Sequence, residues 1–201
     1  MTILRPLSAL LMLSAAGLLS GCAATVVGAG ASAGVAAAEE RGLEGAVDDA
    51  KIRAEINHLW FQHDLEMYRQ VGLTISEGRV LLTGIVPTDK ARADAVRLAW
   101  QASGVKEVLN EIMVRPEGEA AIDQGTDIVI SQKLKARLMF DKEIRNINYT
   151  IDVVDGVVYL MGIAQNENEL QRVIAHARDI SNVKKVVNHV RLKTDPRRIS
   201  G

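Results

Sequence analysis

Few side chains in this sequence combine the types and spacing that chemistry requires. The histidines are His58, His63, His176 and His189. His58 and His63 are five residues apart, so they do not share a helix face as an i, i+4 pair would, and no acidic cluster at ligand spacing accompanies them. We therefore predict no metal site and no cofactor, and we expect His176 and His189 at the surface. The neighbouring carboxylates Asp48 and Asp49 are expected to interact favourably with the positive end of a helix dipole at a helix N-terminus.

No nucleophile or nucleotide motif is complete. The Gly-x-Ser-x-Gly pattern at residues 30–34 lies within a stretch of small residues and lacks the preceding strand of a nucleophile elbow. The Gly-rich stretch 28–34 lacks the Lys-Ser/Thr pair and the preceding strand of a phosphate loop. We predict that the protein is not an enzyme and expect no small-molecule substrate.

The single cysteine, Cys22, closes an apolar segment. Arg5 precedes an apolar run over residues 7–19, which is shorter than the ~20 residues of a membrane span, and the run leads into Leu-Ser-Gly-Cys. This ending resembles the lipobox of bacterial lipoproteins. The resemblance implies that residues 1–21 are a signal peptide and that the sulfur of Cys22 carries a diacylglyceryl group. The alternatives are a buried cysteine after a plain signal peptide, or one long span over residues 7–38.

The residues after Cys22 bear on localisation. In lipoproteins of this type, Asp after the cysteine commonly retains the protein at the inner membrane. Ala23 stands there instead, which by the same resemblance favours the outer membrane with the protein facing the periplasm. Because residues 23–38 are mostly small, we interpret residues 22–47 as a lipidated flexible tether.

Composition limits the remaining function classes. The 201 residues carry a formal net charge of -1 and only 3% aromatic residues. No global basic field or set of aromatic platforms is therefore available for nucleic acid, and we predict no nucleic-acid partner. One cysteine excludes an intramolecular disulfide framework.

The body of the chain is one unit repeated twice. Residues 48–114 align without a gap with residues 126–192, with thirteen identities in 67 positions. This predicts two domains with these boundaries, a linker over residues 115–125 and a basic tail over residues 193–201. The first domain has a net charge of -2 (8 basic, 10 acidic residues) and the second +2 (10 basic, 8 acidic residues).

Each unit has the pattern helix, strand, strand, helix, strand. The first helices have apolar stripes, Ile52-Ile56-Trp60 and Ile130-Leu134-Leu138, with Thr126 as the expected cap of the latter. Glu77-Gly78 and Asp155-Gly156 predict hairpin turns, and Gly84 and Gly162 are expected to end the second strands. Second helices should start at Thr88 and Asn166 and stop at Ser103-Gly104 and Ser181-Asn182. The last strands are predicted over residues 108–114 and 186–192.

Two motifs occur in both copies. They are Gly-x-Val-x-Leu-x-Gly at residues 78–84 and 156–162, and Gly/Asn-Val-Lys-x-Val-x-Asn at residues 104–110 and 182–188. Both resemble the BON domain of bacterial envelope proteins. The resemblance implies an α+β fold with two tandem αββαβ domains, each with two helices on a small three-stranded mixed sheet. A lipobox before two such domains resembles the dual BON-domain outer-membrane lipoproteins linked to envelope integrity and division sites.

The first helix of the second domain offers a candidate binding face. At helical spacing, residues of apolar, amide and cationic character lie away from its core stripe: Ile128, Val129, Gln132, Lys135 and Met139. Lysine beside apolar side chains suits the surface of an anionic bilayer, and resemblance to the family implies phospholipid contact on this helix. The alternative is that Ile128 and Val129 pack against the first domain or the linker.

These observations support a binding function. The leading hypothesis is a periplasm-facing outer-membrane lipoprotein that binds an anionic phospholipid membrane surface through its second domain and helps to maintain outer-membrane integrity. The alternative is a structural adaptor that binds an envelope protein partner through its sheet edges or exposed helix face. A third hypothesis, based on the resemblance to the family, is an osmotic-stress protein that binds a small ligand.

Overall fold

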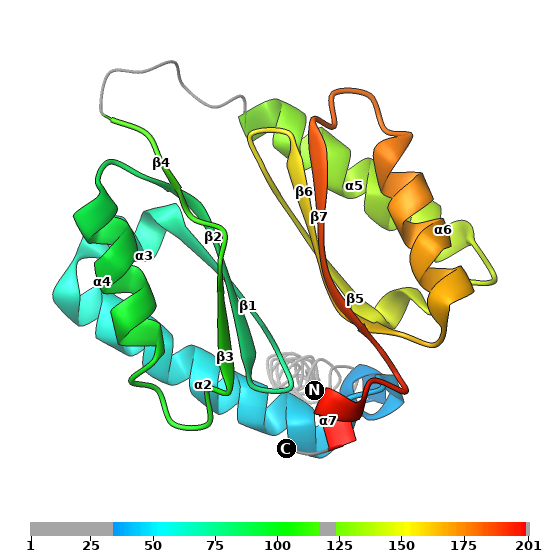
Figure 1. Cartoon of the computed structure of the whole chain (residues 1–201), viewed down its shortest axis with the longest axis horizontal. Helices are drawn as coiled ribbons and strands as arrows, with labels where there is room; N and C mark the ends of the chain where they lie inside the picture. The colour runs from blue at the N-terminus through cyan, green and yellow to red at the C-terminus, as the bar shows by residue number, and fades with distance from the viewer. Residues whose placement is uncertain (1–33, 117–123, 200–201) are drawn as a thin grey trace, which may run out of the picture.

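The computed structural model describes residues 34–116 and 124–199. These residues form two units, and each places its helices on one face of a small sheet (Figure 1). The predicted signal peptide 1–21, the lipidation site Cys22 and part of the predicted linker lie outside the described residues. None of the helices in the described ranges is long and apolar enough to cross a membrane.

The first domain follows the predicted order of elements. Its helices are α2 (Gly42–His63), the short α3 (Leu65–Gln70) and α4 (Asp89–Ala99), and its strands are β1 (Val71–Ser76), β2 (Arg79–Val86), β3 (Glu107–Asn110) and β4 (Met113–Val114). Strand β1 pairs antiparallel with β2, which pairs in parallel with β3 and β4. The predicted stripe Ile52, Ile56 and Trp60 is buried against the sheet, and the Trp60 indole N–H donates to the carbonyl oxygen of Ala95 at 3.1 Å.

The second domain repeats this plan. It contains α5 (Gln124–Phe140), the 3₁₀ turn η1 (Asn146–Asn148), β5 (Tyr149–Val154), β6 (Val157–Ala164), α6 (Glu167–Arg178), β7 (Lys185–Leu192) and the short α7 (Pro196–Ile199). The sheet order is β5-β6-β7, antiparallel and then parallel. The predicted stripe Ile130, Leu134 and Leu138 lies in its core. The predicted α+β fold with two tandem units of helices on a small mixed sheet is therefore confirmed.

Both hairpin turns and both second-helix caps form as predicted. Glu77 and Gly78 have φ angles of 56° and 75°, and Asp155 and Gly156 have φ angles of 51° and 74°, so each turn has two consecutive left-handed residues. The Thr88 side chain accepts a hydrogen bond from Ala91 N–H, and the Asn166 side chain accepts one from Glu169 N–H.

The glycines in the second strands have a different role from the predicted one. Gly84 and Gly162 lie inside β2 and β6 and do not end them. Gly162 has a φ angle of 137°, and a Cβ there would collide with the carbonyl oxygen of Asn148. Absence of a side chain therefore allows the segment before β5 to approach the strand closely.

Several helix boundaries differ from the predicted ones. Helix α5 begins at Gln124, so Thr126 lies inside its first turn instead of capping it. Helices α4 and α6 end at Ala99 and Arg178, and the left-handed residues Gly104 and Asn182 lie in the turns that follow. The predicted strand over residues 108–114 is interrupted between β3 and β4, where the Asn110 side chain accepts a hydrogen bond from Ile112 N–H.

The predicted tether was wrong in its second half. Residues 34–38 are helical, and α2 begins at Gly42. The segment between these helices contacts the second domain: Glu40 N–H donates to the Asn148 side chain at 3.0 Å, and Arg145 pairs with the Glu40 carboxylate at 2.8 Å. Charged residues near the end of the small-residue stretch thus attach this segment to the folded body.

The two sheets face each other, with the helices outside (Figure 1). Leu81 on β2 packs with Tyr159 and Met161 on β6 in an apolar cluster separate from the two domain cores. Polar contacts surround it, including a hydrogen bond from the Thr83 hydroxyl to Asp152 and an ion pair between Arg115 and Asp155 at 2.7 Å. The sheet faces that carry no helices are therefore used to join the domains.

Candidate functional site

The predicted binding residues all lie on the exposed side of α5. Ile128 is 61% exposed and Met139 63% exposed, and Val129, Gln132 and Lys135 are also exposed. The core residues of the same helix project from its other side. Helical periodicity therefore placed these five positions correctly relative to the core, although their role stays a prediction.

The exposed face is larger than the sequence reasoning recognised. Phe140, the last residue of α5, is 81% exposed. It continues a second exposed row with Val129, Lys133 and Ala136, at i, i+4, i+7 and i+11. Continuing the helical spacing from Val129 to the end of the helix would have found it. Phe140 adds an aromatic ring to the exposed face of α5.

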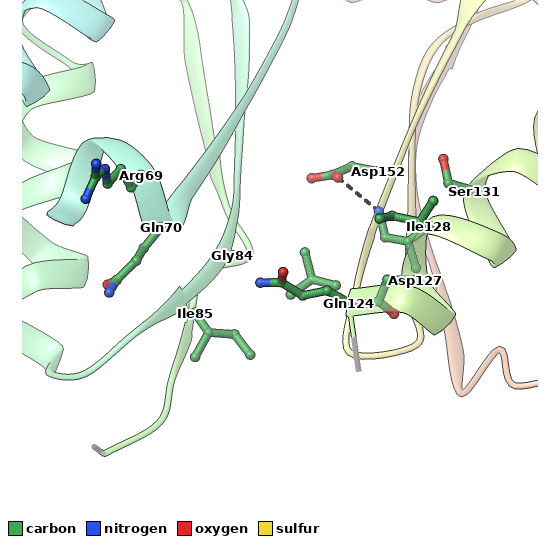
Figure 2. A pocket seen from close by; sticks show the side chains of 11 residues that line it. Arg69, Gln70, Gly84, Ile85, Gln124, Asp127, Ile128, Ser131 and Asp152 are labelled. Carbon is green, nitrogen blue, oxygen red and sulfur yellow. Dashed lines mark hydrogen bonds between the residues drawn. The ribbon is translucent and has the colours of Figure 1, made fainter. Parts of the chain in front are cut away.

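The start of α5 also forms one wall of a groove between the domains. The groove has a cavity volume of about 460 Å³ and is lined by Ile128 and Gln124 on one side and by Gln70 and Ile85 of the first domain on the other. Figure 2 shows Ile128 and Gln124 on the α5 side with Gln70 and Ile85 across the space. Because Ile128 stays 61% exposed, it is not packed against the first domain.

The charge on the α5 face is basic. Lys133 and Lys135 are exposed and make no ion pair within the part of the chain that the structure describes. Arg137, closer to the core, pairs with Asp179 at 2.7 Å. Free ammonium groups beside exposed apolar side chains can contact anionic groups and an apolar phase together.

The acidic pair Asp48-Asp49 does not act at a helix start, because α2 begins at Gly42. Asp49 is buried, and its carboxylate accepts hydrogen bonds from Glu77 N–H at 3.0 Å and Gly78 N–H at 2.9 Å. Asp127 binds the turn of the second domain in the same way, through the N–H groups of Asp155 and Gly156. The repeated Asp therefore holds each hairpin turn against the first helix.

A third buried carboxylate, Glu169, joins the start of α6 to β5. It accepts hydrogen bonds from Arg145 N–H at 3.1 Å, Gln165 N–H at 3.1 Å and the Tyr149 hydroxyl at 2.9 Å. Burial, reinforced by the Glu169 carboxylate, raises the pKa of the Tyr149 hydroxyl. The hydrogen-bonding capacity of the buried Glu169 carboxylate is therefore met within the protein, as a structural network requires.

The histidines are dispersed. His176 contacts Asp141 at 2.8 Å and His189 contacts Glu111 at 2.9 Å. The prediction that both are surface residues was wrong for His189, which lies between the two domains because β7 faces the first sheet. Within residues 34–116 and 124–199, no group of three or more His, Cys, Asp or Glu residues could hold a metal ion.

Comparisons with known proteins agree with the repeat. The BON domain family profile matches residues 48–116 and 126–194. An uncharacterized protein in the gshII 5′ region of Anaplasma centrale is 45% identical over 147 residues, which cover 73% of this chain and 96% of the relative.

Two further relatives have descriptive names. The outer membrane lipoprotein DolP of Haemophilus influenzae is 30% identical over 187 residues, covering 92% of this chain and 95% of the relative. The osmotically-inducible protein Y of Escherichia coli is 25% identical over 148 residues, covering 73% of this chain and 74% of the relative.

Proposed function

The chain belongs to the BON-domain family, and on this premise we propose that it is an outer-membrane lipoprotein that binds anionic phospholipid through α5 and helps to maintain outer-membrane integrity. The exposed face of α5 carries the proposal. It combines Ile128, Val129, Met139 and Phe140 with lysines that lack ion pairs in the described residues. The name of the Haemophilus relative supports the location.

The proposed anchor is Cys22. Acylation of its sulfur, with the further chains usual for such lipoproteins, would hold the protein at the membrane, since each buried methylene contributes about 0.8 kcal/mol. With Ala23 next to it, the anchor would lie in the outer membrane and the two domains would face the periplasm. Attached in this way, α5 needs only a modest affinity of its own for the lipid surface.

The energetics of the α5 face favour an anionic surface over a neutral one. Lys133 and Lys135 each contribute about 1 kcal/mol near anionic lipid, and salt screens this contribution. The apolar side chains can enter the interfacial zone, where burial of apolar surface adds to the attraction. The buried carboxylates Asp49, Asp127 and Glu169 hold backbone N–H groups and therefore have a structural role.

Co-sedimentation with vesicles tests the proposal. The fragment 34–201 retains both cores and every interdomain contact described above, so it separates α5 from the anchor. We expect binding to phosphatidylglycerol vesicles, weak binding to phosphatidylcholine vesicles, and weaker binding at higher salt. The double variant Ile128→Asp/Lys135→Glu should bind about tenfold more weakly or worse, because a charge reverses and apolar contact is lost.

The matched control is Lys51→Glu on α2, where an exposed lysine pairs with Asp48. It should bind as the parent does, and melting curves of all proteins should agree closely. If the folded double variant sediments as well as the parent, α5 is not the membrane surface. If the double variant melts at a lower temperature than the parent, Ile128 stabilises the fold, and the loss of vesicle binding is then no evidence for a lipid surface on α5.

An adaptor function is the second candidate, and one observation favours it. The first domain exposes Phe61, Leu65 and Tyr68, and the rings of Phe61 and Tyr68 meet edge to face at 5.8 Å between centroids. Aromatic side chains are enriched in protein interfaces. Crosslinking to an envelope protein that is lost in Phe61→Asp and kept in Lys135→Glu would support the adaptor. Equal crosslinking by both variants would oppose it.

A further inference from the structure

A second pocket lies where the two domains and the C-terminal helix α7 meet. Its cavity volume is about 400 Å³. It is at the α7 end of the molecule, whereas α5 begins near the opposite end (Figure 1). The pocket is lined by five cations from both domains and α7: Arg79, Lys106, Arg191, Arg197 and Arg198.

The two carboxylates of the lining are already engaged. Glu107 accepts hydrogen bonds from Arg79 Nε at 2.7 Å and from Arg191 Nη2 at 2.9 Å. Glu77 accepts hydrogen bonds from Nη2 and Nε of Arg198, at 2.7 and 2.8 Å. Arg79 also donates to the carbonyl oxygen of His189 at 2.9 Å. Neither carboxylate therefore neutralises the other cations of the lining.

Donor groups remain after these pairings. The Nε of Arg191 is buried and has no hydrogen-bond partner among the described residues. Lys106 makes no ion pair in the same ranges, unlike its repeat equivalent Lys184, which pairs with Asp155 at 2.8 Å. A buried N–H without an acceptor is unfavourable, so its presence beside a cavity indicates an absent acceptor.

The net charge of the pocket defines the class of that acceptor. Five cations and two carboxylates leave a charge of +3 in the lining. Asp195, which pairs with Arg197 at 2.6 Å without lining the pocket, lowers the local excess to +2. The pKa of the Arg191 guanidinium is lowered, first by burial and then by the charge of Arg79. Such a cationic excess favours an anion with two negative charges.

We infer that this pocket, named here the interdomain arginine pocket, binds a phosphate-type dianion through Arg191 and Lys106. The unpartnered Nε–H of Arg191 can donate a charge-assisted hydrogen bond to a phosphate oxygen, and Lys106 supplies a point charge of the kind phosphate sites use. The cavity exceeds the volume of one phosphate group, so a phosphomonoester fits as well as inorganic phosphate. Because Lys106 comes from the first domain and Arg191 from the second, the bound anion would tie the domains together.

Thermal melting and calorimetric titration of the fragment 34–201 with inorganic phosphate test the inference. Phosphate should raise the melting temperature more than sodium chloride does at equal ionic strength. Arg191→Gln should weaken phosphate binding about tenfold, because it removes a charged donor. Lys106→Gln, at an exposed side chain that leaves the fold undisturbed, should weaken it in the same direction.

The matched control is Lys185→Gln. It removes one exposed positive charge from the other end of β7, away from the pocket, and should bind phosphate as the parent does. The Ile128→Asp/Lys135→Glu variant should also keep phosphate binding, which separates this inference from the proposed lipid face. Equal phosphate effects in the parent, Arg191→Gln and Lys106→Gln, or no effect beyond that of chloride, would overturn it. If Arg191→Gln does not fold, Lys106→Gln decides.

The source of the phosphate group is resolved with glycerol 3-phosphate and short-chain phosphatidic acid as further probes. Equal affinity for inorganic phosphate and for the lipid indicates free phosphate as the ligand. Binding of phosphatidic acid that greatly exceeds binding of both inorganic phosphate and glycerol 3-phosphate indicates a lipid headgroup. Either result, if lost in Arg191→Gln and Lys106→Gln, supports the pocket.

Discussion

Replacement of Asp49 by alanine should severely destabilise the first domain, whereas the same change at Asp48 should not. Asp49 is 4% exposed and accepts hydrogen bonds from two N–H groups of the β1–β2 turn and from the Arg41 guanidinium at 2.8 Å. Asp48 is exposed and pairs with Lys51 on the same helix turn. Two adjacent carboxylates of equal chemistry therefore differ only in where the fold places them.

The magnitude follows from the bonds that are lost. Asp49→Ala leaves the N–H groups of Glu77 and Gly78 without their acceptor, and the bond to Gly78 is buried. A hydrogen bond to a charged group contributes about 1.5–3 kcal/mol, so two of them, with some access for water at the turn, give about 3–5 kcal/mol. For a domain of this size 1 kcal/mol corresponds to roughly 4–8 °C, so melting should fall by more than about 12 °C.

Urea unfolding of the fragment 34–201, followed by tryptophan fluorescence, measures this loss. Both tryptophans belong to the first domain, and Trp60 lies in its core, so the signal reports on the domain that is changed. Asp48→Ala should stay within about 0.5 kcal/mol of the parent, as exposed substitutions usually do. If Asp49→Ala unfolds at the same urea concentration as Asp48→Ala, the carboxylate does not hold the turn.

Two further results are expected. Cys22→Ser removes the sulfur that lipidation requires, so unprocessed precursor should accumulate and the protein should be lost from the outer-membrane fraction. Normal fractionation and an unchanged mass of the mature protein would contradict the proposed anchor. The pKa of Asp141 is lowered to about 2, first by the hydrogen bond with His176, so its contribution to stability is complete above its ordinary pKa of 3.8 and is lost as the pH falls toward 2. The stability difference between the parent and Asp141→Asn should therefore shrink between these pH values in acid unfolding curves, and a constant difference would show that the carboxyl titrates normally.

The local elements were predictable because their signals are local. An apolar stripe at helical spacing identifies a buried helix face, and an Asp-Gly pair between alternating runs specifies a turn with left-handed residues. Repetition of both signals in two copies was sufficient for the α+β fold and the domain order. The same periodicity placed Ile128, Lys135 and Met139 outside the core, and it missed Phe140 only because the pattern was followed too short a distance.

Long-range pairing was not predictable from these signals. Nothing near Asp49 in the sequence indicates that its carboxylate meets the turn at Gly78, and nothing near Glu40 indicates that it meets Arg145. Both contacts depend on how far each helix extends and on which surface it reaches. These are properties of the assembled domains, so they appear only when the chain is folded.

The packing of the two sheets against each other was only partly predictable from the sequence. Strands β2 and β6 are apolar on both faces, through residues such as Leu81 and Tyr159, and such strands are covered on both sides. The sequence thus required that something cover the second face, but the partner could have been a linker, another protein or the other domain. The tertiary structure selects the other domain, and by doing so it brings Arg79 and Arg191 to one pocket, because side chains on the rims of two facing sheets meet only after the sheets have packed.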